Sequence, residues 1–185
     1  MQSISKVVAY AFLYNHYLLA GKEEEIEKWI GEEPSGLPFN SPSFDKDGRP
    51  HNPMVNAGAI LVCTLLVNEG KTVKDFQNFY KKAASTERAD IDLPLYLEEQ
   101  LTGTTNHALK SLMLANKAFP KKETFELTSK LAEDGLNWYF AQCSLLVSVE
   151  SVARFGAMLA NNGINPSTGE RIIEPLTVKA TVTIM

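Results

Sequence analysis

Apolar residues recur at helical spacing along most of this chain, and that repeat is the strongest constraint on its fold. Apolar side chains that return every three or four residues bury one face of a helix, whereas half-buried strands alternate apolar and polar residues. The helical pattern covers residues 5–20, 57–68, 123–146 and 149–161, and no strand-like alternation stands out. The sequence therefore predicts a mostly α chain, and its 185 residues suffice for one domain with a sizeable core.

Capping residues and glycines indicate where helices begin and end. Thr72 and Ser148 are expected to cap the helices that follow them, because their side chains can accept a hydrogen bond from the first helical turn. Gly135 is a candidate break in the longest helical pattern. The remaining expected helices cover residues 22–30, 73–84, 105–117 and 175–185.

Residues 31–55 interrupt the helical pattern and are rich in proline, glycine, serine and asparagine. A loop of this length in a compact domain is usually functional or disordered. This one carries apolar side chains at Leu37, Phe39, Phe44 and Met54 that could anchor it. We therefore expect an ordered loop that contributes to a functional site.

The composition argues against several classes of partner. A net charge of −4 and a pI near 5.4 disfavour nucleic acid and anionic membrane surfaces, and no apolar run reaches the length of a membrane span. Cys63 and Cys143 lie in apolar helical segments and are expected to be buried free thiols. No metal is expected, because the histidines lack the spacing of metal ligands.

Ser3 and Lys6 stand at S-x-x-K spacing where the first helical segment begins. Residues three apart share a helix face, so the Lys6 amine could approach the Ser3 hydroxyl, and the helix dipole favours an alkoxide in the first turn. The same pair supplies nucleophile and base in serine acyl-transfer enzymes related to β-lactamases. A surface serine and lysine is the alternative, with Ser5 as a helix cap.

Two longer strings, GEEPSGLPFN (31–40) and PHNPMVNAGAI (50–60), resemble the serine-dependent glutaminases. These enzymes hydrolyse L-glutamine to L-glutamate and ammonia on a β-lactamase-like fold. The similarity extends to residues 1–6, 138–144 and 159–171. It implies that residues 1–185 are a partial glutaminase catalytic domain: the helical part of a β-lactamase-like α/β fold, whose N-terminal strands and C-terminal K-S-G strand lie largely outside this chain.

The resemblance also implies roles for individual residues. Ser3 would be the nucleophile, Lys6 its proton partner, and Tyr139 a third catalytic group able to share a proton with Ser3. A carboxylate at Glu99 suits the ammonium of an amino acid, and an amide at Asn106 suits its carboxylate. The substrate-binding residues that the resemblance implies are Gln2, Ser3, Asn56, Glu99, Asn106 and Tyr139.

Each of these residues also has a purely structural interpretation. Asn56 could be only the cap of the helix that it begins, and Asn106 a polar residue of a first turn. Glu98, which precedes Glu99, leaves the register of the substrate clamp open. Tyr139 lies among apolar residues and could belong to the core.

The chain departs from the family pattern at two places. Val7 stands where the family usually has proline, and residues 99–106 keep only the glutamate, glycine and asparagine of a more polar run. The departure at residues 99–106, together with the expected truncation, supports an alternative function, in which a catalytically inactive glutaminase-like fragment acts as a binding or assembly module. A β-lactam-binding S-x-x-K protein is a third interpretation, disfavoured because no S-D-N or S-x-N motif follows.

The resemblance implies further properties of the protein. The expected ligand is L-glutamine, no cofactor is needed, and the expected assembly is a homodimer or homotetramer. The compartment would be mitochondrial for an animal protein and cytoplasmic for a bacterial one. Residues 1–185 alone are expected to have little or no activity, because oxyanion-hole donors such as that of the K-S-G strand are each worth about 10²–10³ in rate.

Overall fold

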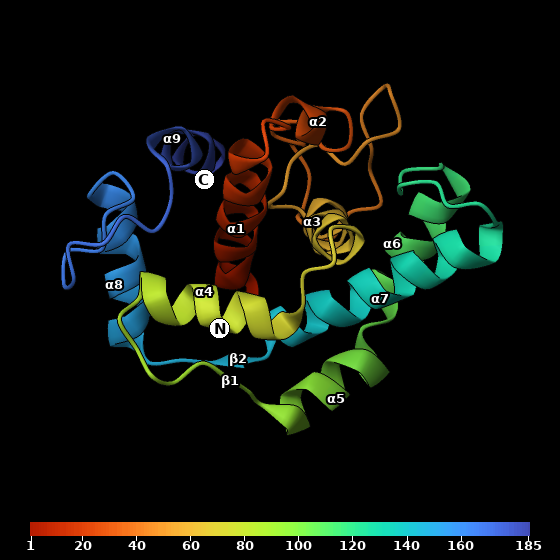
Figure 1. The fold of residues 1–185 in the computed structure, drawn as a ribbon. Helices are drawn as coiled ribbons and strands as arrows, with labels where there is room; N and C mark the ends of the chain where they lie inside the picture. The colour runs from red at the N-terminus through yellow and green to blue at the C-terminus, as the bar shows by residue number, and fades with distance from the viewer.

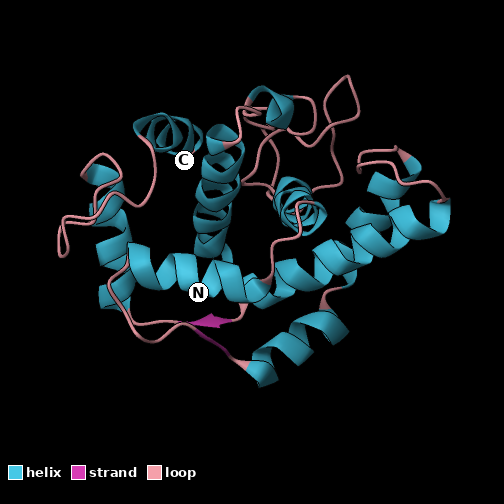
Figure 2. Cartoon of the chain, in the orientation of Figure 1, coloured by secondary structure: helices cyan, strands magenta, loops and turns pink.

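The computed structural model describes residues 1–185, and nearly all of its regular structure is helical (Figures 1 and 2). The elements are η1 (Gln2–Ile4, a 3₁₀ helix), α1 (Ser5–Leu19), α2 (Glu24–Glu27), α3 (Asn56–Asn68), α4 (Val73–Ala83), β1 (Asp90–Ile91), α5 (Leu93–Thr102), α6 (Thr104–Ala115), α7 (Phe125–Cys143), β2 (Leu145–Leu146), α8 (Val149–Ala160) and α9 (Pro175–Ile184). The predicted mostly helical fold is confirmed. None of the helices combines the length and apolarity that a membrane crossing requires.

The only sheet is one short antiparallel pair. β1 pairs with β2 so that Asp90 faces Leu146 and Ile91 faces Leu145. The next backbone amide, that of Asp92, donates to the Ser144 carbonyl oxygen at 2.9 Å. This pairing fixes the start of α5 beside the end of α7 (Figure 1).

The core is built around α3, which packs most extensively against α7. Eleven of the thirteen α3 residues are buried, as expected for a helix that is apolar on all sides. The two helices approach closely at Gly135, where an added Cβ would lie 2.0 Å from Thr64 Oγ1. The predicted break at Gly135 is wrong: α7 runs through it as one 19-residue helix, because the glycine serves close helix packing rather than a bend.

Helix α1 stands between α9 and α3, and its N-terminal end reaches α7 (Figure 1). The short η1 turn that precedes α1 also contacts α7. The S-x-x-K segment therefore lies where α1, α3 and α7 meet.

Two of the predicted helix caps are confirmed and one is wrong. Thr72 forms a capping box at α4, and Ser148 accepts a hydrogen bond from the first turn of α8. At α3 the N-cap is Val55, and Asn56 is the first helical residue with no capping hydrogen bond. Asn52 Oδ1 instead accepts from the two backbone amides just before the helix, which leaves the Asn56 side chain free for tertiary contacts.

The loop over residues 31–55 contains no helix or strand and is closed by several hydrogen bonds. The Gly31 amide donates to the Pro50 carbonyl oxygen at 2.9 Å, and the Asn56 amide donates to the Phe39 carbonyl oxygen at 2.7 Å. Asn52 Nδ2 donates to the Glu33 carbonyl oxygen at 2.9 Å. These bonds fix the loop, and in particular Phe39, beside the start of α3.

Only two of the four predicted apolar anchors pack against the core. Phe44 and Met54 are partly buried against it, whereas Leu37 and Phe39 are exposed. The anchor role predicted for Leu37 and Phe39 is therefore wrong. Phe39 instead lies against the amine of Lys6.

Candidate active site

Residues from six elements come together around the start of α1. Hydrogen bonds join five of the seven predicted site residues in two groups, one of Gln2 with Glu99 and one of Lys6 with Asn56 and Asn106. Ser3 lies between the two groups in the chain. Tyr139 is connected to the same turn through a thiol on α7.

Lys6 is held by a buried amide. Its Nζ donates to Asn56 Oδ1 at 2.7 Å, and Asn56 Nδ2 donates to Asn106 Oδ1 at 2.9 Å. The orientation of the Asn56 amide fits the charged form of Lys6, which can only donate and so is paired with the amide oxygen. The interpretation of Asn56 as only a helix cap is thereby excluded. The neutral side chain of Asn56 connects the Lys6 amine to Asn106, the residue expected to bind a carboxylate.

Burial lowers the pKa of the Lys6 amine from its usual range, and the nearby Cys143 acts in the opposite direction. The Lys6 residue is only 3% exposed. Part of its cover comes from Phe39, whose ring centre lies 5.1 Å from Nζ. A lysine with a lowered pKa can accept a proton near neutral pH, which an exposed lysine cannot do.

Ser3 is exposed and lies in the 3₁₀ turn before α1, not in the first turn of the α-helix. No hydrogen bond joins it to Lys6, whose amine is directed to Asn56. Ser5 is the other serine of the segment, but it is fully buried and its Oγ donates to the Gln2 carbonyl oxygen at 2.7 Å. Ser5 is therefore neither a free nucleophile nor the N-cap, which is Ile4.

Gln2 and Glu99 bring α5 to the same turn. Gln2 Nε2 donates to Glu99 Oε1 at 3.1 Å. Glu99 is half-buried, whereas its neighbour Glu98 is exposed and forms no such contact. The structure thus brings Glu99, and not Glu98, to the candidate site.

Tyr139 is buried in the core, with 3% of its surface exposed. Burial raises the pKa of its hydroxyl well above the usual range, so the phenol stays protonated. Cys143 lies one turn further along α7 and also affects the pKa of this hydroxyl, and no hydrogen bond joins Tyr139 to Ser3. As placed here, Tyr139 can donate a hydrogen bond.

Sequence reasoning missed the contacts of Phe39 and Cys143 with this site. Cys143 was expected only as a buried thiol, yet its Sγ lies 3.9 Å from Ser5 Oγ, and it affects the pKa of Tyr139 one turn earlier on α7. The four-residue spacing of Tyr139 and Cys143 on one helix face was the signal that could have indicated this contact. For Phe39, no local pattern specifies an aromatic ring above a lysine.

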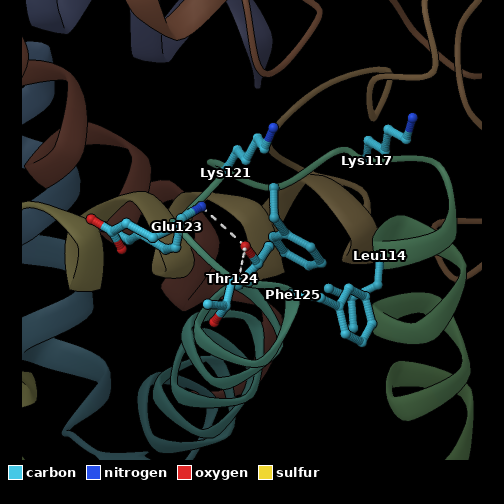
Figure 3. A pocket seen from close by; sticks show the side chains of 9 residues that line it. Leu114, Lys117, Lys121, Glu123, Thr124 and Phe125 are labelled. Atoms are coloured by element: carbon cyan, nitrogen blue, oxygen red, sulfur yellow. Dashed lines mark hydrogen bonds between the residues drawn. The ribbon is translucent and has the colours of Figure 1, made fainter.

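A separate cavity of about 280 Å³ lies between the end of α6 and the start of α7 (Figure 3). Lysines and apolar side chains line it, including Lys117, Lys121 and Phe125. None of the predicted site residues lines this cavity, so it belongs to a different part of the molecule.

Comparisons with known proteins agree in the family that they indicate. Putative glutaminase 2 of Caenorhabditis elegans is 35% identical over 188 residues, a match that covers 100% of this chain and 29% of that protein. A glutaminase of Microcystis aeruginosa is 36% identical over 188 residues, covering 100% of this chain and 52% of the relative. The crystal structure of a Bacillus glutaminase in the presence of 4.3 M NaCl is 25% identical with a TM-score of 0.84, covering 100% of this chain and 59% of that one.

The chain thus spans between about a third and about half of the length of these two curated relatives. The family model described as Glutaminase matches residues 1–185 throughout. The chain therefore belongs to the glutaminase family.

Proposed function

We propose that the protein hydrolyses L-glutamine to L-glutamate and ammonia through a serine acyl-enzyme. The observation that carries this proposal is the buried Lys6, whose pKa is lowered and whose amine is held by Asn56 at the end of the S-x-x-K turn. A buried lysine beside an exposed serine is costly for folding and suits the activation of a nucleophile. Membership of the glutaminase family supports the choice of glutamine as substrate.

The proposed reaction has two steps. Ser3 Oγ attacks the side-chain amide carbon of glutamine, and its proton passes through Lys6 to the departing nitrogen, which leaves as ammonia. Water then attacks the glutamyl ester, and the Ser3 oxygen recovers a proton as glutamate leaves. Tyr139, which remains protonated, would donate a hydrogen bond within the site.

The amino-acid end of glutamine would be bound by the remaining candidates. The Glu99 carboxylate would pair with the substrate ammonium, in place of its present contact with Gln2. The amides of Asn56 and Asn106 would bind the substrate carboxylate, and Gln2 would contact the substrate beside the nucleophile. No cofactor is required for this chemistry.

The proposal extends to the larger protein. The match to 59% of the Bacillus glutaminase chain supports residues 1–185 being the helical part of a larger catalytic domain with a β-lactamase-like α/β fold. A homodimer or homotetramer is proposed on the resemblance to the family alone.

A second candidate is a catalytically inactive glutaminase-like module. It is favoured by the absence of a hydrogen bond between Ser3 and Lys6. It is also favoured by residues 99–106, which keep only the glutamate, glycine and asparagine of the family's more polar run. Such a module would bind or assemble with other chains without turning over glutamine.

Ammonia release from L-glutamine, measured beside Ser3→Ala, separates the two candidates. The glutaminase proposal expects an electrophilic glutamine analogue to add its mass to Ser3. It also expects ammonia release that is low from residues 1–185 alone but still exceeds the Ser3→Ala background. Ser111→Ala is the matched control, since it removes an exposed serine hydroxyl from α6. Equal ammonia release by the unmodified chain and by Ser3→Ala, with no adduct at Ser3, would favour the inactive module.

A further inference from the structure

The turn that carries Ser3 has an unusual backbone. Gln2, one residue before Ser3, has φ of +54°, in the left-handed region. Residues with a Cβ avoid this region because the side chain crowds the following carbonyl oxygen, and they remain there only when the surrounding structure holds them. The contacts that hold Gln2 therefore bear directly on where the Ser3 hydroxyl points.

Ser5 provides one of these contacts, beside the bond from the Gln2 side chain to Glu99. Its Oγ donates to the Gln2 carbonyl oxygen at 2.7 Å, and its backbone amide also donates to the carbonyl oxygens of Gln2 and Ser3. A serine that bonds back to a carbonyl three residues earlier is common in helices. Here the acceptor is the left-handed residue itself, and Ser5 is completely buried, so water does not compete for its hydroxyl.

Cys143 connects this serine to α7. Its Sγ lies 3.9 Å from Ser5 Oγ, and both side chains are buried. Tyr139 lies one turn before this thiol on α7, and the thiol affects the pKa of its hydroxyl. The Gln2–Ile4 turn is thus connected to α7 through Ser5 and Cys143, at the point where the third proposed catalytic group lies.

We propose that Ser5 and Cys143 are positioning residues that hold the Gln2–Ile4 turn against α7 and thereby set the direction of the Ser3 hydroxyl. Neither has to contact the substrate. The consequence for catalysis rests on the proposed role of Ser3 as nucleophile, whereas the effect on the turn does not.

The test compares the full chain with Ser5→Ala and Cys143→Ala, two substitutions that remove atoms and add none. Hydrogen exchange of the amides of residues 3–6 should accelerate about fivefold in both, as expected for the loss of one net hydrogen bond. The maximal rate at which an electrophilic glutamine analogue labels Ser3 should fall about tenfold, because a misplaced nucleophile reacts slowly. The analogue concentration that gives half of that rate should not change. Cys143→Ser, which keeps a hydrogen-bonding group, should recover most of both losses.

Ser111→Ala is the matched control, because Ser111 Oγ makes the same kind of bond, to the His107 carbonyl oxygen at 3.0 Å, on α6. It should match the unmodified chain in both measurements. The positioning role is overturned if exchange in Ser5→Ala and Cys143→Ala equals that in Ser111→Ala, or if exchange rises while Ser3 is labelled at an unchanged rate. A third outcome is faster exchange in Ser5→Ala and Cys143→Ala while Ser3 is not labelled even in the unmodified chain. That outcome would support the role of these residues in holding the turn and would contradict the proposed function.

Discussion

Lys6 Nζ donates a hydrogen bond of 2.7 Å to Asn56 Oδ1, and both side chains are buried. The asparagine is neutral, so it orients the amine without the negative charge of a carboxylate. A carboxylate in its place would raise the pKa of the amine. The other end of the same amide bonds Asn106 at 2.9 Å. One side chain at the start of α3 therefore fixes both the proposed base and a proposed substrate ligand.

Asn56→Asp should inactivate the site without changing the size of this side chain. The Asn106 amide must then turn so that its Nδ2 faces the new carboxylate. A carboxylate next to the Lys6 amine favours the charged amine, so the Lys6 pKa rises and less neutral base remains at pH 7. We expect the rate of Ser3 labelling at pH 7 to fall by about tenfold or more, since each unit of pKa shift changes the free-base fraction about tenfold. The rate should recover at alkaline pH. A loss that is the same at every pH would contradict this account.

Lys6→Met should remove activity but not folding. General base catalysis is typically worth about 10²–10⁴ in rate, and methionine fills a similar volume without a buried charge. We expect Lys6→Met to lose Ser3 labelling by at least about 10² while its urea unfolding at pH 7 stays cooperative. Loss of cooperative unfolding in Lys6→Met would show that the lysine is needed for the fold itself.

The lowered pKa of Lys6 also predicts how stability depends on pH. Between the lowered folded pKa and the unfolded value of 10.5, the unfolded chain binds more protons than the folded chain. The free energy of unfolding therefore rises with pH across that interval. Relative to Lys6→Met, the unmodified chain should gain stability from pH 7 to pH 10 in urea titrations. A difference between the two proteins that does not change with pH would contradict the burial of a lysine that loses its proton on folding.

Phe39→Ala tests whether the ring above Lys6 keeps water from the amine. Phe39 is 59% exposed, so its removal should cost little stability. Hydration of the Lys6 amine should raise its pKa toward the usual range, because burial is the main cause of the present shift. The rising limb of the pH profile of Ser3 labelling should move to higher pH. Leu37→Ala, which removes another exposed apolar side chain of the same loop, should leave the profile in place.

Local signals in the sequence predicted most of the helices. Helix α1 and helix α3 follow from their apolar spacing, and the caps at Thr72 and Ser148 follow from side chains that bond within their own first turn. The strands β1 and β2 could not be predicted, because two residues each form no pattern and pair only through tertiary structure. Helix α5 was not predicted, although Leu93, Leu97 and Leu101 recur at helical spacing, and these three side chains are exposed in the structure.

The resemblance supplied candidate site residues but not the contacts between them. The glutaminase resemblance named Lys6, Asn56 and Asn106, and the structure joins them by hydrogen bonds. Cap preference misassigned Asn56 because local propensity does not register a buried amine that approaches from another helix. The contacts of Phe39 and Cys143 were missed for the same reason, since both depend on which elements the fold brings together.

Gly135→Ala should destabilise the chain at the crossing of α3 and α7. An added methyl would lie 2.0 Å from Thr64 Oγ1 and 2.8 Å from the Thr64 backbone, so the helices must move apart. Overpacking of this kind costs about 1–3 kcal/mol. Gly156→Ala on the exposed side of α8 is the matched control, since nothing lies within 4 Å of its added Cβ, and it should stabilise by about 0.4–1 kcal/mol. Urea unfolding of both variants checks this, and a Gly135→Ala chain as stable as Gly156→Ala would mean that the two helices are not packed as closely as the structure shows.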